Sequence, residues 1–149
     1  MRLATGNGEV SAMPERKTMK RAQADLREGK SASTAAGEFV REEMHHIREG
    51  KHGARNTKQA IAIALSKARR AGVPLKPPAP GKTSERTRKS AERAYEAGQH
   101  GGASHEPSPR RSRATEHALE REPHAAASHA ALSRQAKSAA TRRHRAAAH

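Results

Sequence analysis

The chain has 149 residues, and its 30 Lys and Arg against 15 Asp and Glu give a formal net charge of +15. Only 33% of the residues are hydrophobic, most of them alanine, and the aromatic residues are Phe39 and Tyr95. A large apolar core is excluded, because it could not offset about 1–2 kcal/mol of backbone entropy per ordered residue. The lack of cysteine excludes disulfides and thiolate metal sites. The charge favours an anionic partner, first of all nucleic acid.

The N-terminal segment, MRLATGNGEVSA at residues 1–12, shows no hydrophobic periodicity and lacks the apolar middle of a secretory signal. We expect it to form a disordered extension, and Met13 is a second candidate start of the protein. The longest apolar run, residues 60–65, is too short for a membrane span. These features predict a protein that stays in the cytoplasm and does not bind a membrane.

Two helices are predicted before residue 50. Over residues 18–28, Met19, Ala22 and Leu26 recur on one helical face, and Gly29 follows as a stop. Over residues 34–49, Ser33 precedes the helix as its N-cap, and Gly50 follows it. The apolar stripe of this second helix consists of Ala36, Val40, Met44 and Ile47, with Phe39 at its edge.

The stretch GKHGARNTKQAIAIALSKARRAG, residues 50–72, holds the longest apolar pattern of the chain and predicts a third helix. Asn56 and Gln59 have the spacing of a capping box, and Gly72 closes the helix. Residues 51–81 contain no Asp or Glu. The basic residues of this interval are Lys51, Arg55, Lys58, Lys67, Arg69, Arg70 and Lys76.

These cations are open to two interpretations. A helix C-terminus favours positive charge through its dipole, so Arg69 and Arg70 could be solvated residues at the end of a core helix. The dipole does not account for the lack of acids over the whole interval. We therefore favour an anion-binding face that includes the basic residues from Lys51 to Lys76.

The Pro-rich segment VPLKPPAPGK, residues 73–82, leads to a fourth predicted helix over residues 84–97. Ala91, Ala94 and Tyr95 are the side chains of this helix that we expect to pack on the core. Residues 13–99 are thus predicted to form a small all-α domain of three to four helices.

The last part of the chain, residues 100–149, is rich in Ala, Arg, His and Ser, with Leu119 and Leu132 as its large aliphatic residues. Ala and Arg favour helix, but no apolar stripe is present, so we expect a basic tail that is disordered or becomes helical on a partner. SPRR at residues 108–111 resembles the Ser-Pro-basic-basic turns of linker-histone and sperm-protein tails. The candidate nucleic-acid-binding residues of the tail are Arg110, Arg111, Arg113, Arg134, Lys137, Arg142, Arg143 and Arg145.

Catalytic and metal sites are not predicted. No Ser, His and acidic residues stand in a nucleophile elbow, and a chain with so few core residues is poorly suited to pre-organise an oxyanion site. The densest histidine group is His45, His46 and His52, and His45 and Glu49 are spaced i, i+4. A structural zinc site needs about four ligands, and the sequence offers no convincing set. We therefore predict no enzyme, no metal site and no cofactor.

The run AGEFVREEMHHIREGKHGARNTKQAIAIALSKARRAGVPL, which starts at residue 36, resembles a family of small basic bacterial proteins of uncharacterised function. Members of that family begin with MPE, matched at residues 13–15, and share tails like ALSRQAKSAA, matched at residues 131–140. The resemblance covers residues 13–99 well and the tail loosely. It implies a bacterial, cytoplasmic protein, often labelled DNA-binding, and carries over no functional residues.

Taken together, these features predict a protein that binds duplex DNA through its phosphates without sequence specificity, in the manner of nucleoid-associated or linker-histone-like proteins. Lys and Arg would supply affinity by displacing condensed counterions. The scarcity of aromatic residues argues against stacking on single strands, but not against duplex RNA. The alternatives are therefore an RNA- or ribosome-associated protein and a protein-interaction module of antitoxin or stress type. The sequence does not predict an oligomeric state.

Overall fold

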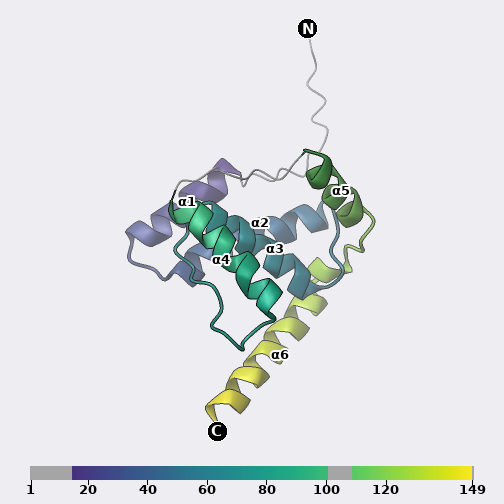
Figure 1. Cartoon of the computed structure of the whole chain (residues 1–149). Helices are drawn as coiled ribbons and strands as arrows, with labels where there is room; N and C mark the ends of the chain where they lie inside the picture. Colours follow the sequence, from purple (N-terminus) through teal and green to yellow (C-terminus); the bar gives the residue numbers. More distant parts are fainter. Residues whose placement is uncertain (1–14, 101–108, 149) are drawn as a thin grey trace.

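The structure, a computed structural model, describes residues 15–100 and 109–148 (Figure 1). Within these ranges every regular element is a helix and there is no strand, so the predicted all-α fold is confirmed. The helices are α1 Arg16–Arg27, α2 Ala32–Arg48, α3 Thr57–Arg70, α4 Glu85–Gln99, α5 Pro109–Glu120, the short 3-10 helix η1 Ala125–Ala127, and α6 His129–Ala147. The extension predicted at residues 1–12 lies outside the described residues. None of the described helices is long and apolar enough to cross a membrane.

Local signals set the first four helices largely as predicted. The side chain of Asn56 accepts the Gln59 amide at the start of α3, and the Gln59 side chain accepts the Arg55 amide at 2.6 Å. α1, α2 and α3 each end before a glycine with positive φ, as expected. The N-cap of α2 is Ser31 instead of Ser33, because the Ser31 hydroxyl accepts the Thr34 amide and the helix begins two residues earlier.

The core is built mainly from alanine and lies in two clusters. The first joins α1, α2 and α3 around Phe39, which is 1% exposed. The second lies at the other end of α2 and α3, around Met44 and Ile47, and includes Ala126 and Ala127 of η1. Small side chains let the helix backbones come close together, so a chain with few large apolar residues still buries two compact clusters.

α4 packs on the outer side of α3 through a row of small residues. Ala91 and Ala94 are buried, and Gly98 follows at helical spacing on the same face. A Cβ atom at Gly98 would lie 1.7 Å from the backbone oxygen of Arg69. The contact between the ends of α3 and α4 therefore requires glycine at this position.

The prediction of three to four helices is too low, and the expected disorder of the tail is not confirmed. α5, η1 and α6 follow residue 108, and η1 packs against α2, α3 and α6. The contact uses alanine side chains and backbone carbonyl groups, with Leu132 half-buried beside them. Because none of these creates an apolar stripe, hydrophobic periodicity did not reveal the contact.

Gly98→Ala is expected to destabilise the domain by about 1–3 kcal/mol, since the added methyl group overpacks a backbone contact. Gly37→Ala is the matched control, because Gly37 is exposed in α2 and a Cβ atom there meets nothing within 4 Å. That control should gain about 0.5–1 kcal/mol from helix propensity. Urea unfolding of the two variants measures the difference, and equal stabilities would contradict the close approach of α3 and α4.

Candidate nucleic-acid interface

The predicted nucleic-acid-binding residues lie on the surface, with two exceptions. Lys67 is half-buried and Arg69 is buried, whereas the other predicted Lys and Arg residues are exposed. The two exceptions come from α3, the helix whose basic end suggested an anion-binding face. Their partners explain why they are enclosed.

Arg69 holds the Pro-rich segment against the domain. It is 7% exposed; its Nε donates to the Leu75 carbonyl at 3.0 Å and its Nη2 to the Lys76 carbonyl at 3.3 Å. Burial lowers the pKa of the Arg69 guanidinium. Its hydrogen bonds point into the protein, so we do not expect Arg69 to contact phosphates, although the sequence predicted that it would.

Lys67 pairs with an acid that comes from another helix. Its Nζ lies 2.8 Å from Oε2 of Glu43, a residue of α2 that is 1% exposed. The interval 51–81 contains no acid of its own, but the fold brings this one from residue 43. The charge of Lys67 is therefore compensated inside the protein, and we do not expect Lys67 to contact phosphates either.

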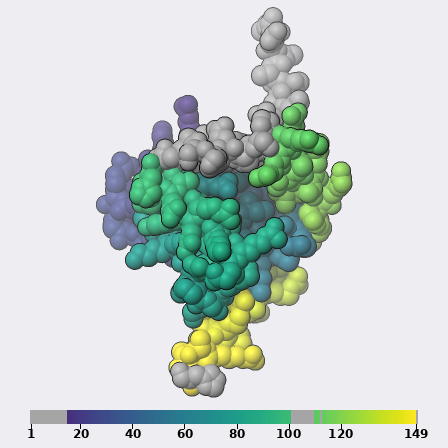
Figure 2. Space-filling model, in the orientation of Figure 1, coloured from purple at the N-terminus to yellow at the C-terminus, as the bar shows by residue number. Residues whose placement is uncertain are grey.

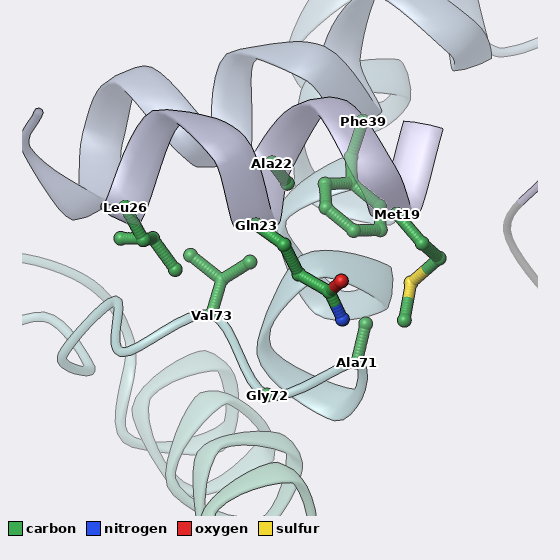
Figure 3. A pocket seen from close by; sticks show the side chains of 8 residues that line it. All are labelled: Met19, Ala22, Gln23, Leu26, Phe39, Ala71, Gly72 and Val73. Carbon is green, nitrogen blue, oxygen red and sulfur yellow. The ribbon is translucent and has the colours of Figure 1, made fainter. Parts of the chain in front are cut away.

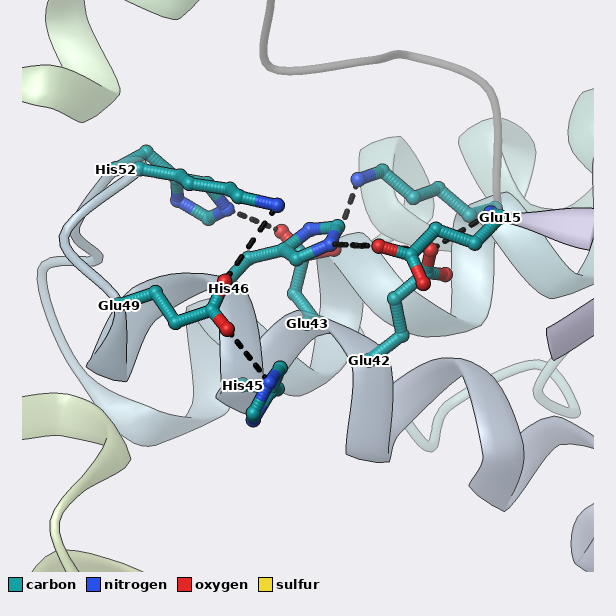
Figure 4. A network of polar contacts seen from close by, with 9 residues as sticks. Glu15, Glu42, Glu43, His45, His46, Glu49 and His52 are labelled. Carbon is teal, nitrogen blue, oxygen red and sulfur yellow. Dashed lines mark hydrogen bonds and ion pairs between the residues drawn. The ribbon is translucent and has the colours of Figure 1, made fainter. Parts of the chain in front are cut away.

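Glu43 also contacts His52, in the loop between α2 and α3 (Figure 4). Oε1 of Glu43 and Nε2 of His52 are 2.7 Å apart, but neither atom has a well-aligned hydrogen bond. Burial raises the pKa of Glu43, but the contacts with His52 and Lys67 outweigh burial and lower this pKa overall. The contact with Glu43 raises the pKa of His52. Glu43 therefore links α2 to both α3 and the loop.

A second polar group stands beside the first, where the chain enters α1. His46 Nε2 lies 3.1 Å from Oε1 of Glu15 and 3.9 Å from Oε1 of Glu42. The Glu15 amide donates to Glu42 at 2.7 Å, which fixes the start of α1 on α2. The hydrogen bond with His46 lowers the pKa of Glu15. Sequence reasoning noticed these histidines but paired His45 with Glu49, a contact that is present on the surface at 2.7 Å.

The tail is attached to the domain through its backbone. The amides of Gly53 and Ala54 donate to the carbonyls of Leu119 and Pro123 at 2.8 and 3.0 Å. The Thr57 hydroxyl donates to the Ala126 carbonyl at 2.6 Å, and Arg48 Nε to the Ala127 carbonyl at 2.8 Å. We call these four contacts the tail dock. They anchor residues 119–127, which directly precede the N-cap of α6 at Ser128.

α6 carries the largest set of exposed cations without neighbouring acids. Its 19 residues contain no Asp or Glu and no buried residue, and the helix extends away from the rest of the molecule (Figures 1 and 2). Within the described part of the chain, its Lys and Arg side chains make no ion pair. These are Arg134, Lys137, Arg142, Arg143 and Arg145.

The spacing of these cations gives α6 one strongly basic side. At about 100° per residue, Arg134, Lys137, Arg142 and Arg145 fall within an arc of about 140°, and Arg143 points to the opposite side. The four residues span about 16 Å along the helix axis. Arg110, Arg111 and Arg113 are also exposed, on α5.

Sequence reasoning missed the cations of α1. Arg16, Lys17, Lys20 and Arg21 are all exposed, and the one acid of the helix, Asp25, pairs with Lys30 at 2.9 Å. The signal was the composition of the helix itself, because four basic residues precede its single acid. α1 is therefore a second surface that could meet a polyanion.

A small apolar groove opens between α1 and the end of α3, next to Phe39 (Figure 3). Its volume is about 110 Å³, and Met19, Leu26 and Val73 are among the residues that line it. Small-molecule sites usually measure about 300–1,000 Å³. We therefore do not regard this groove as the candidate functional site.

Comparison of the chain with family models, with curated proteins and with solved structures returns no match. The resemblance to small basic bacterial proteins consequently stays a prediction.

Arg69→Ala is expected to destabilise the protein by about 1–3 kcal/mol, because two backbone carbonyls lose a charged donor. Arg70→Ala is the control, since Arg70 is the exposed neighbour with the same charge and should change stability by less than about 0.5 kcal/mol. Thermal unfolding distinguishes the two. If the variants unfold at the same temperature, Arg69 does not hold the Pro-rich segment.

Gly53→Ala is expected to release the tail dock, because a Cβ atom there would lie 1.9 Å from the Glu122 carbonyl oxygen. Hydrogen exchange at the Ala54 amide should accelerate, since its acceptor, Pro123, moves away. The Ala64 amide, inside α3, is the internal control and should keep its protection. Unchanged exchange at Ala54 would show that the dock tolerates the methyl group.

Proposed function

We propose that the protein binds duplex DNA through backbone phosphates, and that α6 is the principal contact. The observation that supports this proposal is the basic side of α6, defined by Arg134, Lys137, Arg142 and Arg145. These side chains are exposed, and their helix contains no acid to offset them. The exposed cations of α1 and α5 would add to the same electrostatic attraction.

The dimensions of α6 fit a duplex. Over the 16 Å or so between Arg134 and Arg145, one DNA strand presents about five phosphates, given a spacing of 3.4 Å per strand. The major groove of B-DNA admits an α-helix, whereas that of A-form RNA is too deep and narrow for side chains to read. A projecting helix therefore favours DNA over duplex RNA.

Two features argue against other modes of nucleic-acid binding. Phe39 is buried and Tyr95 is half-buried, and the chain has no other Phe, Tyr or Trp, so these residue types offer a single strand no fully exposed ring to stack on. Gln135 is the only Asn or Gln in α6, so the helix offers little for reading base edges. Binding should be nearly independent of DNA sequence, as expected of a nucleoid-associated protein in the cytoplasm.

The proposal predicts that the affinity for a duplex of about 20 base pairs falls steeply with salt. Replacing Arg134, Lys137, Arg142 and Arg145 with Ala should flatten the plot of log K against log salt by about 3–4 units, since each lost phosphate contact removes about 0.9. The loss should be the same for unrelated DNA sequences. Fluorescence anisotropy between roughly 50 and 200 mM salt measures the slope.

A charge-matched variant controls for the total charge. Replacing Lys82, Arg86, Lys89 and Arg93 with Ala removes the same number of exposed cations from a region that includes the acids of α4. This control should change the slope by less than about 1 unit. Equal losses in both variants would assign binding to net charge alone, and equal affinity for duplex RNA would favour the RNA alternative.

A further inference from the structure

Five ionisable side chains gather near the C-terminal end of α2. The proposed DNA-binding surface does not use them. Glu43, His46 and His52 form one buried group, and Glu15, Glu42 and His46 form a second (Figure 4). Within each group, one nitrogen or carboxylate oxygen from every residue lies within 4.8 Å of the others. His46 belongs to both groups, so the two are continuous.

This cluster contains buried polar atoms that lack a hydrogen bond. They are Oε2 of Glu42, Oε1 of Glu43 and Nε2 of His52. Glu43 and His52 are each 1% exposed, so water does not reach them from the surface of the domain. Buried polar atoms nearly always have a partner, so three such atoms without an aligned hydrogen bond make this cluster the candidate site for a bound ion.

The ring of His52 shows where that species would lie. Nδ1 of His52 is 2.9 Å from the Gly53 carbonyl, which can only accept, so Nδ1 carries the ring proton. The other nitrogen, Nε2, lies 2.7 Å from Oε1 of Glu43 without forming an aligned hydrogen bond to it. When neither atom carries a proton, they repel each other unless a metal cation lies beside both.

His46 is oriented in the same way. Its Nε2 lies 3.1 Å from the carboxylate of Glu15, which favours a proton on Nε2 and leaves Nδ1 as a donor of electrons. Histidines that bind metals almost always donate their other N–H to a carboxylate or a backbone carbonyl. The partner of His46 is the carboxylate of Glu15, and the partner of His52 is the backbone carbonyl of Gly53.

The local charge favours a divalent ion. Glu15, Glu42 and Glu43 bring three negative charges, and Lys67 is the cation in direct contact with them, at 2.8 Å from Glu43. With neutral histidines, the group has a net charge of −2. Lys67 binds Oε2 of Glu43 and so leaves Oε1 for another ligand.

We propose that Glu43, His46 and His52 bind a divalent transition-metal ion of the zinc type. Two imidazole nitrogens and one carboxylate oxygen suit zinc better than Mg²⁺ or Ca²⁺, which prefer oxygen ligands. Tetrahedral zinc with bonds of about 2.0–2.2 Å separates its ligand atoms by about 3.3 Å. The distance between Nε2 of His52 and Oε1 of Glu43 would therefore lengthen by roughly half an ångström. The His46 ring would move toward the ion.

Such an ion would act on the tail dock. It would tie α2 to His52, and the next residue, Gly53, donates its amide to Leu119. The loop would be fixed at the point where the tail attaches. This inference does not depend on DNA binding, and its test contains no DNA.

The test uses the full chain after metal is removed with EDTA. Titration with zinc chloride in a calorimeter should give one tight site per chain, and cobalt(II) should give the visible absorption of a tetrahedral complex. His52→Gln and His46→Gln should each weaken zinc binding by more than the roughly 10–100-fold that follows loss of an outer hydrogen-bonding partner. Glu15→Gln, which removes such a partner, should fall within that range.

Matched controls are His45→Gln and His129→Gln, because both residues are exposed. They should keep the tight site, since any zinc at surface histidines is weak. Imidazole NMR of the unaltered protein gives a second measurement that needs no variant. Zinc should perturb the ring nitrogens of His46 and His52 while the Nδ1 proton of His52 remains.

Three results would overturn the proposal. The first is no tight zinc or cobalt site in the unaltered protein. The second is binding that the control variants lose as strongly as His52→Gln does. The third is a proton on Nε2 of His52 that persists in excess zinc, because His52 and Glu43 would then form an ordinary buried ion pair.

Discussion

The buried carboxylate of Glu43 is the contact on which the arrangement of the domain depends. A carboxylate cannot be buried at 1% exposure without polar or charged partners, and here they come from two directions, Lys67 on α3 and His52 in the preceding loop. Meeting this requirement sets the position of α3 on α2. It also sets the loop at Gly53, and through that residue the attachment of the tail. A polar constraint thus does part of the positioning that large apolar side chains do in richer cores.

Buried alanine residues do the rest of the positioning of the helices. α3 buries Ala60, Ala64 and Ala68 in one row, and such a row lets a helix approach its neighbours closely on a short apolar surface. The approach is closest where Gly98 of α4 meets the backbone of Arg69. Packing of this kind depends on side chains that are small, as in alanine, or missing, as in glycine. It therefore tolerates polar exteriors but not an added methyl group at the contact.

Much of the helical domain could be predicted from the sequence, because caps and glycine stops are local signals. Asn56 beside Gln59 marked the start of α3, and glycines marked the ends of α1, α2 and α3. The tail dock could not be predicted, since its donors meet backbone carbonyls that no side-chain pattern encodes. The basic end of α3 was misleading for a related reason. Its interval lacks acids in the sequence, but Glu43 reaches Lys67 from another helix, and Arg69 turns inward to carbonyl groups.

The fold therefore divides the basic residues into two kinds that composition does not separate. Lys67 and Arg69 are compensated within the domain, whereas the cations of α6 face solvent on a helix without acids. The tail dock anchors the segment before the N-terminus of α6. The helix would therefore already be formed and oriented when it meets a duplex. A disordered tail of equal charge would lose conformational entropy on binding, and an ordered helix avoids much of that cost. On this view the tail dock contributes to affinity without touching DNA, and the placement of charge matters more than its sum.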